Sequence, residues 1–394
     1  MSNERNSLSM MLDPWRAAWR RRREIARERR LKTMPKSMPK HAPPTATKRI
    51  SLALQGGGAH GAFTWGVLDY ILEDGRLAID GISGASAGAM NAIMLADGLA
   101  RGGSDGARTR LAEFWRAASR DGNIPETQRV ALDRLMSFLP ANASPLQSWM
   151  GAWSKYLSPY DLNPLNINPL KDLVERFVDF EAIRCCSDLR LYISATNVHT
   201  GKLKVFSREE INAEAVMASA ALPYFFRAVE IDGVPYWDGG YTGNPPIYPL
   251  LNSSLSPDVL VVQINPLMRN TTPTSNEEIL NRINEITFNS SLSSEIRVVE
   301  LISDLLAKGE LTSPTGVYRP IRLHRINLGG SKPLDIGSKF NNDYDFFEQL
   351  HKSGRRAARR FLDAHFDDIG VKSTLEHLPE QPPEAAASSS DAAA

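Results

Sequence analysis

Ser86 lies in a run of residues that carry almost no side chain. It is the centre of a G-x-S-x-G pattern that is completed by Gly84, Ala85, Ala87 and Gly88. A pattern of this kind between a strand and a helix is typical of a strained turn that exposes the serine hydroxyl as a nucleophile. An ordinary tight turn would also contain small residues, so this pattern alone leaves both interpretations open.

A second stretch could bind negative charge through its backbone. It consists of Gly56, Gly57, Gly58, Ala59, His60 and Gly61. Successive N–H groups at the start of a helix can hold a phosphate or the oxyanion of an ester-hydrolysis intermediate. The stretch also matches G-x-G-x-x-G, and Asp80 lies near the distance at which a dinucleotide-binding fold places its ribose-binding acid. A nucleotide-binding oxidoreductase is therefore an alternative, and a plain helix start is the simplest one.

Asp238 precedes Gly239 and Gly240, a context that by itself is common in turns. A hydrolase with a histidine base needs that histidine in a late loop. The late candidates lie in an expected strand, in an expected C-terminal helix and in the tail: His324, His351, His365 and His377. His60 is interpreted as a polar residue that stabilises its loop, with catalysis as the alternative. The absence of a suitable histidine favours Asp238 as the base.

The expected secondary structure places these motifs at the junctions of strands and helices. Residues 49–55 are apolar without a polar face, as in a central parallel strand, and a helix is expected at 62–75. A second strand and helix follow at 78–83 and 87–103. This order predicts an α/β fold with a mostly parallel central sheet flanked by helices. Further strands are expected at 189–198, 201–207, 259–266 and 322–328, a hairpin at 229–240, and helices at 211–223, 276–308 and 341–366.

In this order, the three motifs resemble those of the patatin-like phospholipases, in particular bacterial patatin-domain proteins. That family has a Gly-rich oxyanion loop, then a G-x-S-x-G serine, then an aspartate in Asp-Gly-Gly or Asp-Gly-Ala. The stretches ATNVHTGKLKVF and ASAALPYFF, ahead of WDGGYTGNPP, extend the resemblance over about residues 50 to 252. The family often has Asp at the position of Gln55, and Arg or Lys at that of His60.

The resemblance implies a three-layer fold related to the α/β-hydrolases and a serine lipid acyl hydrolase of the phospholipase or esterase type. Ser86 and Asp238 would form a dyad without histidine, and Gly56, Gly57 and Gly58 would form the oxyanion hole. The substrate would be a lipid or another acyl ester, with no cofactor and no metal. A lipid-binding scaffold without turnover is a further alternative, against which the intact Ser86 and Asp238 speak.

Composition divides the chain into four expected parts. Residues 1–49 form a basic arm with a Pro-rich linker, 50–252 a catalytic domain, 253–371 a C-terminal α/β extension packed on it, and 372–394 a disordered tail. The helical region within 132–170 could cover an acyl pocket or form ordinary core.

The first 50 residues carry ten Arg and four Lys against four acidic residues, a net charge of +10, whereas the whole chain carries +1. A basic helix is expected at 14–31. Such arms contact membranes or nucleic acid, or are solvated. Because the arm lacks a recognisable nucleic-acid-reading fold, we expect no nucleic-acid partner and consider peripheral membrane contact instead.

The overall composition, 42% hydrophobic and 23% charged, is that of a globular protein. No apolar run of about 18 residues suggests a membrane span, and the basic N-terminus lacks the apolar core of a secretory signal. Cys185 and Cys186 are adjacent and cannot easily bridge each other. They are expected to be reduced, buried thiols in a cytoplasmic, and so reducing, compartment, with membrane association left open.

Overall fold

The computed structural model describes residues 47–120, 158–162, 166, 168–185, 189–223, 225–253, 255–313, 319–329, 334 and 337–375. The basic arm with its expected helix at 14–31 lies outside these residues. So do most of the region considered as an acyl-pocket cover and most of the tail.

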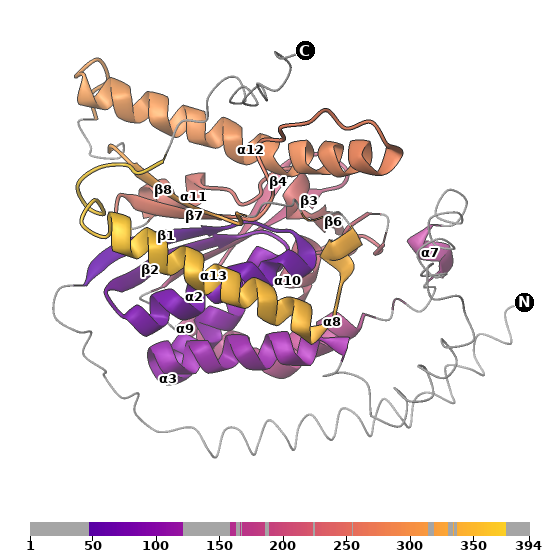
Figure 1. Cartoon of the computed structure of the whole chain (residues 1–394). Coiled ribbons are helices and arrows are strands. Elements are labelled where there is room, and N and C mark those ends of the chain that lie inside the picture. The colour runs from indigo at the N-terminus through magenta and orange to yellow at the C-terminus, as the bar shows by residue number, and fades with distance from the viewer. Residues whose placement is uncertain are drawn as a thin grey trace, which may run out of the picture. The chain divides into compact units, whose positions relative to one another are not determined.

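One sheet of eight strands forms the centre, in the order β5-β6-β3-β2-β1-β7-β8, with β4 also paired to β3 (Figure 1). The strands are β1 Lys48–Leu54, β2 Leu77–Gly84, β3 Arg190–Asn197, β4 Leu203–Ser207, β5 Val229–Ile231, β6 Val234–Asp238, β7 Asp258–Gln263 and β8 Arg322–Asn327. The pairs that join β3, β2, β1, β7 and β8 are all parallel, whereas β4, β5 and β6 pair antiparallel with their neighbours. The predicted fold class, a mostly parallel sheet flanked by helices, is confirmed.

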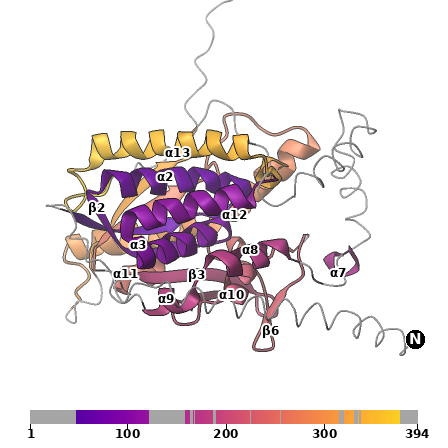
Figure 2. The same ribbon diagram turned by 90° about the horizontal axis from the view of Figure 1, so that it is seen from below.

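Helices cover both faces of the sheet. The longer ones are α2 Gly61–Asp74, α3 Ala87–Ala118, α12 Asn276–Ala307 and α13 Tyr344–His365. The shorter ones are η1 Gly58–His60, α7 Pro159–Leu162, α8 Pro169–Phe177, α9 Phe180–Cys185, α10 Ala213–Ser219, η2 Gly239–Tyr241, α11 Tyr248–Ser253 and η3 Gly337–Phe340. Helices α2, α3 and α13 lie on one face, and α11 and α12 lie on the other (Figures 1 and 2).

The alternation of side chains along the central strands separates two apolar cores. Leu52 and Leu54 of β1 pack in the larger core, together with α2, α3 and α13. Ala53 of the same strand packs in the smaller core with residues of α11 and α12, such as Leu250 and Leu292. Since successive residues of a strand point to opposite faces, an apolar strand buried on both sides requires a helical layer on each face.

The strands beyond residue 252 continue the same sheet. Strand β7 pairs in parallel with β1, and β8 pairs in parallel with β7. The division into a catalytic domain and an extension remains a prediction about domain organisation.

Cys185, at the end of α9, is a free thiol and is exposed, so the prediction that it is buried was wrong. Within the described part of the chain, no helix combines the length and the apolar composition that crossing a membrane requires.

Helices α2 and α13 cross in backbone contact at two glycines. A Cβ atom placed on Gly354 would lie 2.1 Å from the carbonyl oxygen of Phe63, and one placed on Gly66 would lie 2.0 Å from that of His351. Backbone atoms cannot move aside as the end of a flexible side chain can. The two helices approach this closely only because both positions lack a side chain.

We therefore expect Gly354→Ala to lower the free energy of unfolding by about 1–3 kcal/mol, since the added methyl group forces the two backbones apart. Urea denaturation of the full chain measures this value. Gly329→Ala is the matched control, because nothing lies within 4 Å of a Cβ atom at that position. Equal stability of the two variants would show that the helices can separate without cost.

Candidate functional site

The register of β3 brings the ends of two other strands together. Strand β4 pairs with residues 192–196 of β3 and so occupies one edge of that segment. On the other edge, Gly84 at the end of β2 pairs with Ile193, and Asp238 at the end of β6 pairs with Ala195. Two residues along a strand span about 7 Å. The residues that follow β2 and those that end β6 therefore meet at one point of the sheet.

Ser86 occupies the turn between β2 and α3. Its backbone has φ 52° and ψ −120°, a left-handed conformation that is strained for a residue with a side chain. The N–H of Ser86 donates to Oγ of Ser219 at 2.9 Å. The turn depends on Gly88, because a Cβ atom there would lie 2.0 Å from the carbonyl oxygen of Leu54. Helix α3 begins directly after Ser86, which places the positive end of the helix dipole at the hydroxyl.

Asp238 is fully buried and is held from three sides. Its N–H donates to the carbonyl of Ala221 at 2.9 Å, and its own carbonyl accepts from Oγ1 of Thr196 at 2.8 Å. One carboxylate oxygen, Oδ1, accepts from the N–H of Gly240 at 2.7 Å. These three hydrogen bonds fix the backbone of Asp238 and one oxygen of its carboxylate.

The hydroxyl of Ser86 lies close to the carboxylate of Asp238. Among the described residues, Oδ2 has no partner with full hydrogen-bond geometry, yet the hydroxyl of Ser86 is close enough to stabilise its charge. Burial raises the pKa of Asp238 to about 6, and the Gly240 N–H, the Ser86 hydroxyl and the charge of Lys339 act in the opposite direction.

The Gly-rich loop lies against Ser86. A Cβ atom on Gly56 would come within 2.8 Å of Cβ of Ser86. The N–H of Gly56 already donates to Oδ1 of Asn244 at 2.7 Å, so the prediction that Gly56 donates to an oxyanion needs correction. The N–H groups of Gly57 and Gly58 have no acceptor among the described residues. These two groups remain available.

Neutral side-chain amides fix this loop. The carbonyl of Gly56 accepts from Nδ2 of Asn265 at 2.9 Å. Oε1 of Gln55 accepts from the N–H groups of Ile264 at 2.9 Å and Asn265 at 2.8 Å, which ties the end of β1 to the end of β7. Asn244 and Asn265 were not expected from the sequence, although GNPP, which contains Asn244, belongs to the stretch that carries the family resemblance.

Asn91 was also missed, and it joins the starts of α2 and α3. Its Nδ2 donates to the carbonyls of Gly61 at 3.0 Å and Ala87 at 3.1 Å, and its Oδ1 accepts from the indole N–H of Trp115 at 3.0 Å. Gly61 ends the Gly-rich loop and Ala87 follows Ser86. A single buried side chain thus fixes the loop relative to the serine.

Lys339 was not anticipated either. Its carbonyl oxygen packs on Gly58, where a Cβ atom would lie only 2.3 Å from it. Its ammonium group donates to Oδ1 of Asn265 at 2.8 Å and to Oδ1 of Asn284 at 2.6 Å. Burial lowers the pKa of Lys339 to about 8, against the opposing effect of the charges of Glu285 and Asp238.

The histidines have partners other than Ser86. Nε2 of His60 lies 2.7 Å from Oγ of Ser338. Burial, aided by the charge of Lys339, lowers the pKa of His60 to about 3, which keeps its imidazole neutral and a weak base. Of the late candidates, His324 contacts Asp258, His351 contacts Asp69 and His365 contacts Asp368, while His377 lies outside the described residues.

Asp80 is used within the fold. Its Oδ1 accepts from Oγ of Ser51 at 2.8 Å, and its Oδ2 accepts from the N–H groups of Leu255 at 2.9 Å and Ser256 at 2.8 Å. The carboxylate is buried in the middle of β2. Asp80 therefore cannot reach a ribose bound at the end of the strand. It cannot serve as the ribose-binding acid that a dinucleotide-binding fold requires.

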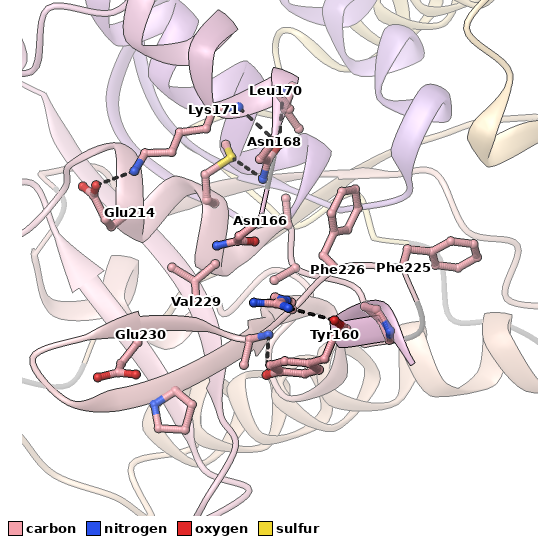
Figure 3. A pocket seen from close by; sticks show the side chains of 17 residues that line it. Tyr160, Asn166, Asn168, Leu170, Lys171, Glu214, Phe225, Phe226, Val229 and Glu230 are labelled. Carbon is pink, nitrogen blue, oxygen red and sulfur yellow. Dashed lines mark hydrogen bonds and ion pairs between the residues drawn. The ribbon is translucent and has the colours of Figure 1, made fainter. Parts of the chain in front are cut away.

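A cavity of about 450 Å³ lies next to the segment that follows α10 (Figure 3). Ala220 and Ala221 line it, and they directly follow Ser219, the partner of the Ser86 N–H. Its apolar wall includes Leu170, Met217, Phe225, Phe226 and Val229, and its polar side includes Asn166, Asn168 and the ion pair Lys171–Glu214. The volume falls in the usual range of small-molecule sites.

Residues 52–251, about half of the chain, match the sequence profile of the family described as patatin-like phospholipase. The chain belongs to the patatin-like phospholipase family. Membership of this family supports the hydrolysis of a lipid. Among curated proteins, none matches the chain. Within the described residues, no group of His, Cys, Asp and Glu has the arrangement of a metal site.

Three solved structures resemble this patatin-like chain. They are VipD from Legionella pneumophila (17% identity, TM-score 0.35), the type III effector ExoU from Pseudomonas aeruginosa (15%, 0.32) and human group IVD cytosolic phospholipase A2 in complex with methyl γ-linolenyl fluorophosphonate (11%, 0.40). The matches cover 78, 82 and 82% of this chain, and 67, 54 and 59% of the other chains, respectively.

The bond from Gly56 to Asn244 gives a direct test of the loop. We expect Asn244→Ala to lower the free energy of unfolding by about 1–3 kcal/mol, because it leaves a buried N–H without a partner. Asn276→Ala, at an exposed position at the start of α12, is the control and should change stability by less than about 0.5 kcal/mol. Urea denaturation of both variants measures the difference. If Asn244→Ala leaves the free energy of unfolding unchanged, Asn244 does not stabilise the loop.

Proposed function

We propose that the protein is a serine lipid acyl hydrolase that cleaves fatty-acyl esters with Ser86 as nucleophile and Asp238 as general base. The observation that carries this proposal is the fully buried carboxylate of Asp238, which lies close to the hydroxyl of Ser86 in its strained turn. A nucleophile beside an oriented base is the arrangement that covalent catalysis requires.

The reaction then proceeds in two steps. Oγ of Ser86 attacks the carbonyl carbon of the ester while Asp238 takes the hydroxyl proton. Asp238 returns that proton to the departing alcohol as the tetrahedral intermediate collapses to an acyl-enzyme. In the second step Asp238 takes a proton from water, the resulting hydroxide attacks the acyl carbon, and Ser86 regains the proton as the fatty acid leaves.

The negative oxygen of each tetrahedral intermediate would accept hydrogen bonds from the N–H groups of Gly57 and Gly58. Backbone donors fixed in advance cost no reorganisation during the reaction and commonly contribute more than any other single effect. The amides of Asn244 and Asn265 would act indirectly, by holding the peptide groups of Gly56 in place.

The cavity beside Ala221 offers room for an acyl chain. Its wall of Leu170, Met217, Phe226 and Val229 matches the apolar character of a fatty acid, and it begins at the backbone that holds Asp238. The ion pair Lys171–Glu214 adds a polar group to the lining. We assign the apolar part to the chain of the ester that is cleaved.

If Ser86 and Asp238 act as one catalytic unit, the losses of activity caused by the two single substitutions do not multiply in the double variant. Ser86→Ala, Asp238→Asn and the double variant should each lose hydrolysis of a soluble short-chain ester by a similar factor, about 10³-fold or more. A double variant whose loss equals the product of the two single losses would contradict the dyad. Labelling by a fluorophosphonate confined to Ser86 would exclude both the oxidoreductase and the scaffold.

The raised pKa of Asp238 predicts the pH dependence. Asp238 accepts a proton only when it is ionised. The value of kcat/KM should therefore be highest above pH 6 and should fall as the pH drops through about 6. Lys339→Gln removes a charge that favours the ionised carboxylate, so the pKa of Asp238 should rise and this acid limb should move to higher pH.

His60→Gln is the control for that profile, since the pKa of His60 lies near 3. Its acid limb should coincide with that of the unmodified enzyme, whatever the effect on the maximal rate. An acid limb that disappears in His60→Gln would make His60 the base in place of Asp238.

A further inference from the structure

The N-terminal half of α12 carries large apolar side chains towards solvent. Ile279, Leu280, Ile283 and Ile286, here called the outer stripe, have exposed fractions of 40, 61, 55 and 53%. At 3.6 residues per turn these four fall on one side of the helix. Phe288 is only 3% exposed and belongs to the opposite side. Contiguous exposed apolar side chains on a folded protein mark a contact surface.

The inward side of the same turns contacts the catalytic site. The ring of Phe288 packs on Gly240, where a Cβ atom would lie 2.5 Å from it, and Gly240 is the N–H donor to Asp238. Asn284 accepts a hydrogen bond from Lys339 at 2.6 Å. The outer stripe therefore flanks the edge of the sheet at which Ser86 lies.

Two exposed phenylalanines lie at the same edge. The rings of Phe225 and Phe340 have centroids 4.5 Å apart, and they are 42 and 44% exposed. Phe340 follows Lys339, which packs on the Gly-rich loop at Gly58. Phe225 lies on the wall of the cavity, beside Phe226 (Figure 3). The pair thus reaches from the Gly-rich loop to the cavity.

We propose that the outer stripe of α12, together with Phe225 and Phe340, forms the surface by which this protein docks on a lipid bilayer. The proposal rests on the proposed function, because an enzyme that cleaves lipid esters must take them from an aggregate. Apolar side chains on two sides of the catalytic edge would enter the boundary between headgroups and acyl chains, with the site facing the substrate.

A bilayer fits this surface better than a second copy of the chain. A protein that covered both the stripe and the phenylalanine pair would close the edge through which an ester must enter. Of the charged residues near the stripe, Arg282 pairs with Glu285 at 3.2 Å, and Glu278 accepts the N–H groups of Thr274 and Ser275 in the capping box of α12. The surface therefore offers apolar contact with the bilayer, and salt does not screen this contact. Salt would weaken binding through the charge of the basic arm.

The test is partition of the full chain onto vesicles of a dialkyl ether phosphatidylcholine at high salt. These zwitterionic lipids cannot be hydrolysed, so binding is separated from turnover. The double variant Ile283→Gln and Ile286→Gln should bind at least about tenfold more weakly, because it replaces two apolar side chains on the contact surface. Phe340→Ser should weaken partition in the same direction.

The matched control is the double variant Val298→Gln and Leu301→Gln on the same helix. These residues are 54 and 58% exposed but lie about 20 Å further along α12, so partition should equal that of the unmodified chain. Hydrolysis of a soluble short-chain ester by the Ile283/Ile286 variant should also be unchanged. If the unmodified chain does not hydrolyse the ester, the proposed function is wrong. Vesicle binding is measured independently of hydrolysis and still tests the docking surface.

Three outcomes would overturn the docking surface. The unmodified chain fails to bind the ether vesicles, or the Ile283/Ile286 variant binds as tightly as the unmodified chain. In the third outcome, light scattering shows that the unmodified chain is a dimer and the variant a monomer, while the variant binds vesicles as tightly as the unmodified chain. The stripe would then be a self-association surface.

Discussion

The shared edge of β3 is the constraint on which the site depends. Because β4 occupies the opposite edge, β2 and β6 must follow one another along the same side of the strand. Ser86 and Asp238 are 152 positions apart in the sequence, yet each needs only to end its own strand in register to meet the other. The strained turn at Ser86 is then held by the hydrogen bond to Ser219 and by the packing of Gly88 on β1.

Burial of Asp238 sets the electrostatics of this edge. A buried carboxylate has to be satisfied by donors, and here the backbone supplies one while the hydroxyl of Ser86 lies close by. The groups that fix the Gly-rich loop are mostly neutral amides, Gln55, Asn244 and Asn265, which organise the backbone without adding charge. The charge of Lys339 lowers the pKa of Asp238, in opposition to the larger effect of burial. A cluster of cations would have kept that carboxylate fully ionised and a weaker base.

The strands, most of the long helices and the places of Ser86 and Asp238 after strands could be predicted from the sequence, because they leave local patterns, but the helix expected at 87–103 continues to Ala118 in α3. The strand expected at 49–55 is β1, and the helix expected at 276–308 is α12. The amides could not be found in this way, since an asparagine acquires its role from contacts such as that of Asn244 with Gly56, 188 positions away. Lys339 lies in a short 3-10 turn without periodicity. The burial expected for Cys185 failed because it ends a short helix at the surface.

The matched family region ends at residue 251, but the contacts of the site do not. Strand β1 is an interior strand only because β7 pairs with it, and the end of β7 supplies the N–H groups that hold Gln55. Asn265 binds the carbonyl of Gly56, and Lys339 packs on Gly58. A chain that stopped after the matched region would leave these groups of the Gly-rich loop without partners and would expose one edge of β1. Unpaired strand edges and buried polar groups without partners are both costly, so the geometry of the loop depends on segments that follow the family region in the sequence.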